Sequence, residues 1–423
     1  MLDIKLFRQD KQLVCDGLKQ KNFNQIDDFT GNNIVDEIIE LDEDIRETNT
    51  EVEKLMAVMN KNNNEIGKYI HTDEEKVKNL KVHNQILQEK IDELEGFLVP
   101  LKANLLNYLG RIPNLPHPGV PSGTHPTDNE IIKDTSIGYT QIYRKPHWDL
   151  IKEYNIVSFD IGNKITGNGF PVYIGQGAKL QRALIQYFLD FNIEAGYIEY
   201  NIPLLVNYDS AYGTGQLPDK EGQMYHVKND DLYLVPTSEV PLTNIFRDEI
   251  VELPIKMTAH SPCFRRESGS HGKEVRGLNR VHQFEKVEIV QIVHPDKSYE
   301  ILEEMVAHVE ELLKSLELPY RILKLCGGDM SFASALTYDF EVYSIAQDRW
   351  LEVSSVSNFE TFQSNRMKIR FKDGKKNRLV HTLNGSSLAL PRIMACLLEN
   401  NQTNEGIKMP KALQNYFGAD YLK

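Results

Sequence analysis

Hydrophobic residues near the start of the chain recur at alternating spacings of four and three. One series runs from Ile34 to Met59, and a second series with the same spacing runs from Val77 to Leu105. Such spacing is typical of the seam of a coiled coil. The polar stretch 60–75 between the two series predicts a turn. We therefore expect an antiparallel hairpin of two helices of roughly 30 residues, each about 45 Å long, that projects as an arm.

The pattern changes after a segment rich in proline and glycine, 110–123, which ends the second helix and marks a boundary. Beyond it, short β-type runs alternate with helical stretches, which is typical of an α+β fold. The sequence thus predicts an N-terminal domain, 1–109, and a second domain, 110–423. The expected strands lie at 197–206, 231–237, 284–293, 349–356 and 378–385, and the clearest helices at 179–192 and 298–316.

Two charge-rich segments, 261–267 and 282–290, are predicted to be strands joined by a loop, 268–281. Side chains of a strand point alternately to its two faces, so each strand presents one row of residues to a common face. Arg266 points away from that face. The two rows are Cys263, Arg265 and Glu267 on the first strand, and Phe284, Lys286 and Glu288 on the second.

An antiparallel register that pairs Glu267 with Phe284 also brings Cys263 opposite Glu288, and we expect this register. The resulting row suits an adenine nucleotide joined to a small amine. An aromatic ring can stack on the base, a carboxylate can accept from the adenine amino group, and a guanidinium matches a phosphate. A solvated hairpin held by weak surface ion pairs fits the two strands equally well.

Composition narrows the class of protein. The 423 residues are 41% hydrophobic and 26% charged, and no apolar run approaches the roughly 20 residues of a membrane helix. The four cysteines lie far apart, which predicts neither disulfides nor a cysteine zinc site. The start of the chain lacks a signal-peptide pattern, so we expect a cytoplasmic protein. A net charge of −13 disfavours indiscriminate binding to nucleic acid, although a local basic patch can override it.

Longer motifs then resolve the ambiguity of the strand pair. Four ordered segments resemble seryl-tRNA synthetases of bacterial type: 235–250, 263–290, 350–367 and 381–402. The helical hairpin at the N-terminus is similar to the arm of that family. The segment 194–207 around Pro203 resembles the first signature motif of class II synthetases, which lies at their dimer interface. "FRRE" (264–267) and "LALPR" (388–392) resemble the second and third motifs.

This resemblance implies an antiparallel-sheet class II catalytic domain preceded by a long coiled-coil arm that reaches toward the variable arm of a transfer RNA. The implied enzyme activates L-serine with ATP to give seryl-adenylate and pyrophosphate. It then transfers serine to tRNA(Ser), and to tRNA(Sec) as well. A homodimer is expected. Neither step needs a protein nucleophile, since positioning and charge stabilisation supply most of the catalysis.

The resemblance also assigns roles within the ATP site. Arg265 would hold the α-phosphate and Arg392 the γ-phosphate, and these are the expected catalytic residues. Pro391 suits the first turn of a helix that presents Arg392. Arg266 faces away, and surface or tRNA contact is its favoured role over contact with ATP. The expected ATP-binding set is Arg265, Arg266, Glu267, Arg280, Val281, Phe284, Glu352, Val353, Ser354, Ser355 and Arg392.

A Mg²⁺ ion that bridges the ATP phosphates is expected at Glu352 and Ser355, because a hard cation takes oxygen ligands. On a regular strand Glu352 shares its face with Ser354, however. Ser355 can therefore join Glu352 only through a bulge or a strong twist.

The resemblance assigns serine recognition to small polar residues and two carboxylates. Buried groups that need the substrate hydroxyl can reject alanine by a factor of about 10⁴, whereas threonine must be excluded by size. Ordinary turn hydrogen bonds are the alternative role for Thr237 and Ser386. The expected serine-binding set is Thr237, Ser238, Glu239, Glu288, Asn384 and Ser386.

The first helix of the arm is acidic, which is unfavourable for contact with RNA phosphates. We therefore expect the lysines of the second helix and of the turn to carry more of the tRNA contact. The alternative is that these lysines are simply solvated. The turn contributes Lys61 and Lys68, and the second helix contributes Lys76, Lys78 and Lys81.

Two other functions share parts of this pattern. A ligase that loads an amino acid onto a carrier protein is disfavoured by the intact arm and by the lack of cysteines suited to zinc. A catalytically silent, tRNA-binding paralogue would keep the arm but lose at least one of four residues. All four are present: Arg265, Glu288, Glu352 and Arg392.

Overall fold

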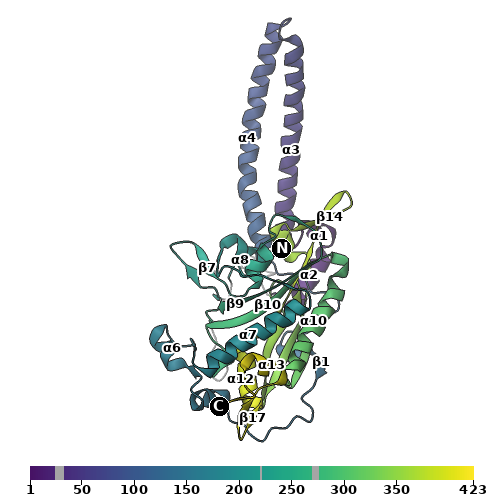
Figure 1. Ribbon diagram of the computed structural model, residues 1–423. Helices are drawn as coiled ribbons and strands as arrows, with labels where there is room; N and C mark the ends of the chain where they lie inside the picture. Colours follow the sequence, from purple (N-terminus) through teal and green to yellow (C-terminus); the bar gives the residue numbers. More distant parts are fainter. Residues whose placement is uncertain (24–32, 220–221, 269–275) are drawn as a thin grey trace. The chain divides into compact units, whose positions relative to one another are not determined.

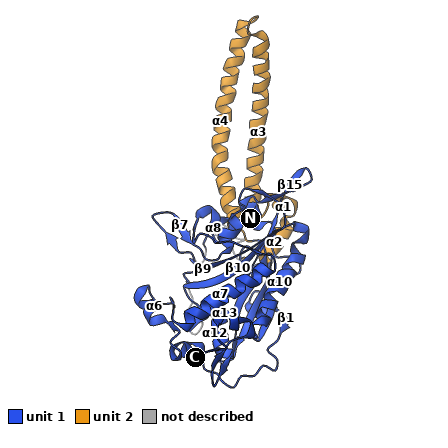
Figure 2. Ribbon diagram, viewed as in Figure 1, with its two compact units in different colours: residues 1, 20–22, 114–423 blue, residues 2–19, 23–113 orange. Residues whose placement is uncertain are grey.

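The computed structural model describes residues 1–23, 33–219, 222–268 and 276–423. It contains two compact units, shown in two colours in Figure 2. One unit comprises residues 2–19 and 23–113, and the other comprises residue 1, residues 20–22 and residues 114–423. The domain boundary expected after residue 109 falls inside helix α4 (Glu74–Arg111), and the two-domain division at that point stays a prediction.

Two long helices form the arm in the smaller unit. Helices α3 (Ile34–Tyr69) and α4 pack together along their length, with Ile38, Ile45, Ile91 and Leu98 buried between them. The coiled-coil hairpin is therefore confirmed. Its helices have 36 and 38 residues and so exceed the expected length. The shorter helices of this part of the chain are α1 (Ile4–Gln9) and α2 (Lys11–Gln20).

The turn of the arm is shorter than the polar stretch predicted. Helix α3 continues to Tyr69, because the asparagines in its last turns satisfy one another across the hairpin. The side chain of Asn62 donates to Oδ1 of Asn84 at 2.8 Å, and Nδ2 of Asn84 donates to Oδ1 of Asn63 at 2.7 Å. The expectation that Lys61 and Lys68 lie in the turn is wrong, since both lie on α3.

An eight-stranded sheet dominates the larger unit (Figure 1). All its ladders are antiparallel except the parallel pair at one edge, β9 and β4. This sheet confirms the expected α+β fold built on an antiparallel sheet. In spatial order the strands are β1 (Glu130–Asp134), β11 (Tyr320–Lys324), β12 (Leu336–Ser344), β13 (Arg349–Asn358), β16 (His381–Ala389), β10 (Gln283–Val293), β9 (Ile255–Phe264) and β4 (Ile198–Glu199).

Helices α7 (Gln176–Glu194), α10 (Ser298–Ser315) and α12 (Leu390–Asn400) cover one face of this sheet (Figure 1). On β10, Val287 and Ile289 point into the core beneath these helices. Because strand side chains alternate, Lys286 and Glu288 point to the opposite face. That opposite face carries the candidate site.

Smaller elements complete the larger unit. The two-residue strand β4 and strand β5 belong to different sheets. The single strand expected at 197–206 is therefore wrong. The physical reason is that Pro203, between the two strands, lacks the N–H that a continuous ladder needs. The remaining helices are α5 (His147–Glu153), α6 (Phe159–Ile165), α8 (Tyr208–Thr214), α9 (Glu239–Asn244), α11 (Phe362–Met367) and α13 (Lys411–Phe417). The remaining strands are β2 (Val157–Ser158), β3 (Val172–Tyr173), β5 (Leu205–Asn207), β6 (His226–Val227), β7 (Leu232–Leu234), β8 (Ile250–Val251), β14 (Arg370–Asp373), β15 (Lys376–Leu379), β17 (Gln402–Thr403), β18 (Gly406–Lys408) and β19 (Tyr421–Leu422).

The register expected between the charged strands is wrong. Phe284 lies opposite Cys263 rather than Glu267, and Glu288 lies opposite Ala259. Strand β9 ends at Phe264, so Arg265 and Glu267 follow it instead of belonging to it. The pairing is displaced by an even number of residues, which leaves the expected faces unchanged.

Candidate active site

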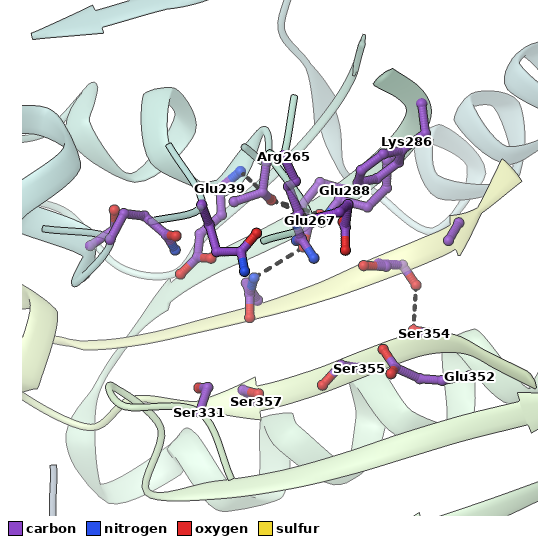
Figure 3. Close-up of a pocket in the computed structure, with 18 of the residues that line it drawn as sticks. Glu239, Arg265, Glu267, Lys286, Glu288, Ser331, Glu352, Ser354, Ser355 and Ser357 are labelled. Atoms are coloured by element: carbon purple, nitrogen blue, oxygen red, sulfur yellow. Dashed lines mark hydrogen bonds and ion pairs between the residues drawn. The ribbon is translucent and has the colours of Figure 1, made fainter. Parts of the chain in front are cut away.

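A cavity of about 600 Å³ opens on the sheet face that bears Lys286 and Glu288. Figure 3 shows Glu239, Arg265 and Glu288 on one side of it, with Glu352 and Ser355 across from them on β13. Most residues expected to bind ATP or serine line this cavity. They are Thr237, Glu239, Arg265, Glu267, Arg280, Val281, Phe284, Glu288, Glu352, Val353, Ser354, Ser355, Asn384, Ser386 and Arg392.

Two of the expected residues do not line the cavity. Ser238 is fully buried, and its hydroxyl lies 2.7 Å from Oγ of Ser261. Arg266 follows the end of β9, and its backbone N–H donates to the carbonyl of Gln223 at 2.9 Å. The expected alternation of Arg265 and Arg266 thus holds beyond the strand end, because only Arg265 reaches the cavity. Residues 269–275 of the expected loop lie outside the described residues.

The buried carboxylate of Glu288 forms one end of the site. Its Oε1 accepts from Nδ2 of Asn384 at 3.0 Å, and its Oε2 accepts from Oγ1 of Thr237 at 3.2 Å. Nζ of Lys286 lies 2.5 Å from the same Oε2. Burial raises the pKa of Glu288, whereas Lys286 and the hydrogen bond from Thr237 oppose that rise. These donors are what an ionised carboxylate needs inside a protein.

A second buried carboxylate, that of Glu239, begins helix α9. Its backbone N–H donates to Oγ1 of Thr237 at 3.3 Å, and its Oε1 accepts from Nε2 of Gln363 at 2.6 Å. Burial, reinforced by the neighbouring charge of Glu288, raises the pKa of Glu239 to about 7. A site with two such carboxylates attracts a small ligand that carries an ammonium group.

Aromatic and cationic side chains line the cavity beyond these carboxylates, and Arg265 stands nearest to them. The guanidinium carbon of Arg265 lies 5.5 Å from the centroid of the Phe284 ring, and Nε of Arg265 donates to the carbonyl of Pro236 at 3.4 Å. Arg280 forms an ion pair with Glu267. Glu267 itself has a φ of +50°, a left-handed conformation that is strained for a residue other than glycine.

Arg392 is presented by the first turn of α12, with Pro391 at the position where proline is favoured. Its Nε donates to the backbone carbonyl of Asn279 at 3.0 Å, and its Nη1 donates to the carbonyl of Glu352 at 2.6 Å. Nη1 also lies 3.5 Å from Oε2 of Glu352. These contacts fix the direction of a guanidinium that still lines the cavity.

A bulge in β13 brings Glu352 and Ser355 to one face, as the sequence required. Glu352 lies opposite Glu341 and Ser354 lies opposite Phe340, so Val353 is the extra residue. Ser355 then pairs with Asp339, which shares a face with Glu341 and therefore with Glu352. Ser354, which also lines the cavity, donates through its hydroxyl to the carbonyl of Ser386 at 2.6 Å.

The donor atoms that Glu352 and Ser355 place on this face are oxygens, which are of the type that suits a magnesium ion. Within the described ranges, no group of three or more His, Cys, Asp or Glu side chains is arranged to hold a metal by itself. Glu352 and Ser355 offer oxygen ligands, which a magnesium ion would complete with phosphates and water. The buried Oδ1 atom of Asp339 lacks a hydrogen-bond partner, and burial of the carboxyl together with Glu352 raises the pKa of Asp339 well above its usual range.

Some lining residues could not be anticipated from the sequence. The strand pattern places Lys286 on the correct face but gives it no role. Gln363, which holds Glu239, and the loop containing Ser331 and Phe332 carry no chemical signal, because a glutamine in a helix or a serine in a loop has no distinctive spacing.

The expected tRNA-binding lysines lie on the arm, where most are exposed and one contacts neighbouring side chains. Lys78 and Lys81 on α4 are exposed. Nζ of Lys76 lies 3.6 Å from Oε2 of Glu65 and 3.7 Å above the ring of Tyr69. Lys61 and Lys68 are exposed on α3.

Among the described residues, no helix is both long and apolar enough to cross a bilayer.

Family models match both halves of the chain. The model described as "tRNA synthetase class II core domain (G, H, P, S and T)" matches residues 224–401, and that described as "Seryl-tRNA synthetase N-terminal domain" matches residues 1–116. The serine–tRNA ligase of Salinibacter ruber is 46% identical over 99% of this chain and 98% of its own length. That of Methylacidiphilum infernorum is 44% identical over the whole of both chains.

Solved structures agree with these matches. The seryl-tRNA synthetase of Pyrococcus horikoshii complexed with ATP superposes with a TM-score of 0.91 and 34% identity, covering 99% of both chains. The cytoplasmic serine–tRNA ligase of Naegleria fowleri in complex with AMP gives a TM-score of 0.86 and 28% identity, covering 100% of this chain and 99% of the other.

Proposed function

The chain belongs to the seryl-tRNA synthetase family and is an ATP-dependent serine–tRNA ligase, and from this we propose which residues hold each substrate. In the first step a carboxylate oxygen of serine attacks the α-phosphorus of ATP, and pyrophosphate leaves. In the second step a ribose hydroxyl of the tRNA attacks the serine carbonyl, and AMP leaves. The observation that carries the assignment is one cavity lined by both buried carboxylates and guanidinium groups.

We propose that serine lies at the carboxylate end. Glu239 and Glu288 supply negative charge for its ammonium, and Thr237, Asn384 and Ser386 surround them. Thr237 and Asn384 are already bonded to Glu288, so the pocket keeps its polar groups oriented before serine arrives. An amino acid without a hydroxyl leaves one of these buried groups unpaired, which rejects alanine. Ser238, which faces away from the cavity, acts through its bond to Ser261 instead.

ATP is proposed to lie between the aromatic and cationic residues. Phe284 provides a face for adenine, and Arg265 and Arg392 neutralise charge that develops on the phosphates. Arg265 stands between the carboxylates and the ring of Phe284, since it contacts that ring and also opposes the rise in the pKa of Glu288 and Glu239. This position supports its assignment to the α-phosphate, where the two substrates meet.

Glu352 and Ser355 are the residues proposed to hold Mg²⁺. When bound, the ion supplies positive charge that offsets the charge of the phosphates. Nη1 of Arg392 lies 3.5 Å from the carboxylate of Glu352, so the same carboxylate keeps the guanidinium in place.

The arm is proposed to hold tRNA(Ser), and tRNA(Sec) in an organism that has it, chiefly through Lys78 and Lys81. Both are exposed on α4, whereas Lys76 contacts Glu65 and Tyr69 within the arm. Lys61 and Lys68 on α3 contribute from an otherwise acidic helix. Recognition through shape and backbone suits such a helical surface.

A homodimer is proposed as the working form, in the cytoplasm. Strand β4 lies at one edge of the eight-stranded sheet, and Ile198 on it is 61% exposed. Leu204 and Leu205, which follow, are 39% and 42% exposed. An exposed apolar edge of this kind is commonly covered by another chain. The four cysteines are free, as in a reducing compartment. Light scattering coupled to gel filtration tests the dimer.

The assignment of the cavity is tested by serine-dependent exchange of pyrophosphate into ATP, without tRNA. We expect exchange with serine but not with alanine or threonine, and a loss of at least 100-fold, roughly, for Arg265→Ala. Arg266→Ala, the neighbouring guanidinium outside the cavity, is the matched control and should retain exchange. A folded Arg265→Ala variant with unchanged exchange would contradict the proposed roles.

A further inference from the structure

Lys286 is a buried cation within the carboxylate end of the cavity. Its side chain is 7% exposed, and its Nζ lies 2.5 Å from Oε2 of Glu288. The same Nζ donates to Oγ1 of Thr237 at 2.9 Å. Both partners belong to the proposed serine site. Nζ of Lys286 thus occupies the position in which the ammonium group of a substrate would contact Glu288 and Thr237.

The backbone around Lys286 is shaped to hold it there. Lys286 pairs with Ala389 and Glu288 pairs with Ser386, so β16 carries an extra residue at this point. Leu388, within the irregular stretch, has a φ of +70°. Bulges redirect side chains and strained residues persist where surrounding structure demands them. The irregularity adjoins the two residues that form the buried ion pair.

The hydrogen bonds of Thr237 and Glu288 determine which of their donor and acceptor positions remain open to a ligand. The hydroxyl of Thr237 accepts from Lys286 and from the backbone N–H of Glu239, and it donates to Glu288. A hydroxyl has one donor and two acceptor sites, so that of Thr237 is saturated. Glu288 receives Lys286, Thr237 and Asn384, which leaves one of about four acceptor positions open.

Glu239 differs, because its carboxylate has a neutral partner, the amide of Gln363. Both carboxylates are buried, but a lysine neutralises one and not the other. We propose that Lys286 is a positioning residue that neutralises Glu288, directs the serine ammonium to Glu239, and leaves the open acceptor position of Glu288 for the serine hydroxyl. This inference rests on the proposed placement of serine.

The charged groups that face this pair come from several elements. Glu239 begins α9, Arg265 follows β9, and Cys263 lies on β9. The neighbouring β16 and α11 contribute the uncharged Asn384 and Gln363. Removal of Lys286 therefore leaves two buried carboxylates with Arg265 as the nearest cation. Two such carboxylates cannot both ionise readily, so the pair should hold a proton to higher pH.

The test uses pyrophosphate exchange from about pH 6 to about pH 9 with the full-length wild type, Lys286→Met and Lys286→Arg. Lys286→Met should raise the KM for serine at least tenfold and change the KM for ATP less than twofold. It should also move the acidic limb of kcat/KM for serine upward by about one pH unit. Lys286→Arg keeps the charge, so it should restore the position of the limb even if it binds serine poorly.

Lys256→Met is the matched control. Lys256 lies on the same sheet, but outside the residues that line the cavity, and it should leave both KM values and the limb unchanged. Thermal unfolding of each variant reports whether it folds. A role in packing alone would lower stability without moving the limb.

The possible results distinguish failure of the proposed serine site from failure of the proposed role of Lys286. Absence of serine-dependent exchange in folded wild type overturns the proposed serine site itself. Normal exchange in the wild type, combined with a Lys286→Met variant whose serine KM and acidic limb are unchanged, overturns the role of Lys286 alone. If Lys286→Met fails to fold, the Lys286→Arg profile decides, because a shifted limb despite a retained charge contradicts the proposal.

Discussion

The buried ring of His147 holds the backbone of Leu278, whose N–H donates to Nε2 of the histidine at 2.9 Å. Nδ1 of His147 lies 2.6 Å from Oε1 of the buried Glu399. The carbonyl of Asn279, the residue after Leu278, accepts from Nε of Arg392. A histidine on α5 thus fixes the turn that anchors the arginine proposed to contact the γ-phosphate.

Gly277→Ala should disturb that turn. Gly277 has a φ of +63°, and a Cβ there would lie 2.3 Å from Nε2 of His147. We expect the free energy of unfolding to fall by more than about 1 kcal/mol, and the KM for ATP to rise. Urea unfolding and exchange kinetics measure the two effects. Gly374→Ala is the matched control, since its φ is +59° with no atom within 4 Å of the added Cβ. Equal losses in both variants would mean that the histidine contact is unimportant.

The affinity for serine should depend on pH through Glu239. Because the pKa of Glu239 is about 7, its carboxylate is largely protonated below that pH and cannot receive an ammonium. The KM for serine should therefore rise as pH falls below about 7, approaching about tenfold per pH unit. The KM for ATP over the same range is the internal control. A serine KM that is constant between about pH 6 and about pH 8 would contradict this account.

Glu239→Gln should stabilise the protein while it impairs serine binding. The pKa of this acid rises from 4.5 to about 7 on folding, so ionisation costs stability as pH rises through that window. The full cost, on the order of 3 kcal/mol, is present above about pH 7 and absent below the unfolded value. Glutamine keeps the acceptor for Gln363 without the charge. Denaturant unfolding of both proteins at about pH 8 and about pH 4 should show a gain only at the higher pH.

The magnesium requirement should depend on Glu352. Glu352→Gln keeps an oxygen but loses the charge, so the concentration of Mg²⁺ that gives half-maximal exchange should rise at least tenfold. Glu341→Gln, on the neighbouring strand and outside the residues lining the cavity, is the comparison. A variant at Glu352 that responds to Mg²⁺ like the wild type would remove this residue from the metal site.

Substitution of the arm lysines should weaken tRNA binding alone. Lys78→Ala combined with Lys81→Ala should raise the KM for tRNA in aminoacylation and leave tRNA-free exchange unchanged. The salt dependence of tRNA binding should become shallower by about 0.7 to 0.9 for each phosphate that the variant no longer neutralises. Lys164→Ala, an exposed lysine on α6, should change neither quantity. An unaltered KM and salt slope in the double variant would place the tRNA-binding surface elsewhere.

The sequence predicted the parts of the molecule that follow from periodicity. The seam of the arm came from its heptad spacing, and the face of Arg265 survived a wrong register because the error was even. The need for a bulge beside Ser355 followed from strand parity alone. The register itself was not predictable, because it depends on where β9 ends and on a loop whose length permits several pairings.

Contacts between residues far apart in the sequence could not be predicted, for a different reason. Gln363 meets Glu239, and His147 meets Leu278, only because distant elements pack together. Neither glutamine nor histidine carries a spacing that marks its partner. Lys286 stood on the right face, yet its ion pair with Glu288 depends on burial, which a single strand pattern does not reveal.

The hydrogen bonds that join Asn62, Asn63 and Asn84 across the arm constrain the alignment of its two helices and therefore its length. A seam made of leucine and isoleucine alone tolerates a slip of one heptad, since apolar residues are interchangeable there. Such a slip would separate Asn62 from Asn84 and remove this partner from the buried amide of Asn62. The hydrogen bonds therefore favour one alignment of the hairpin, and with it one length of the arm.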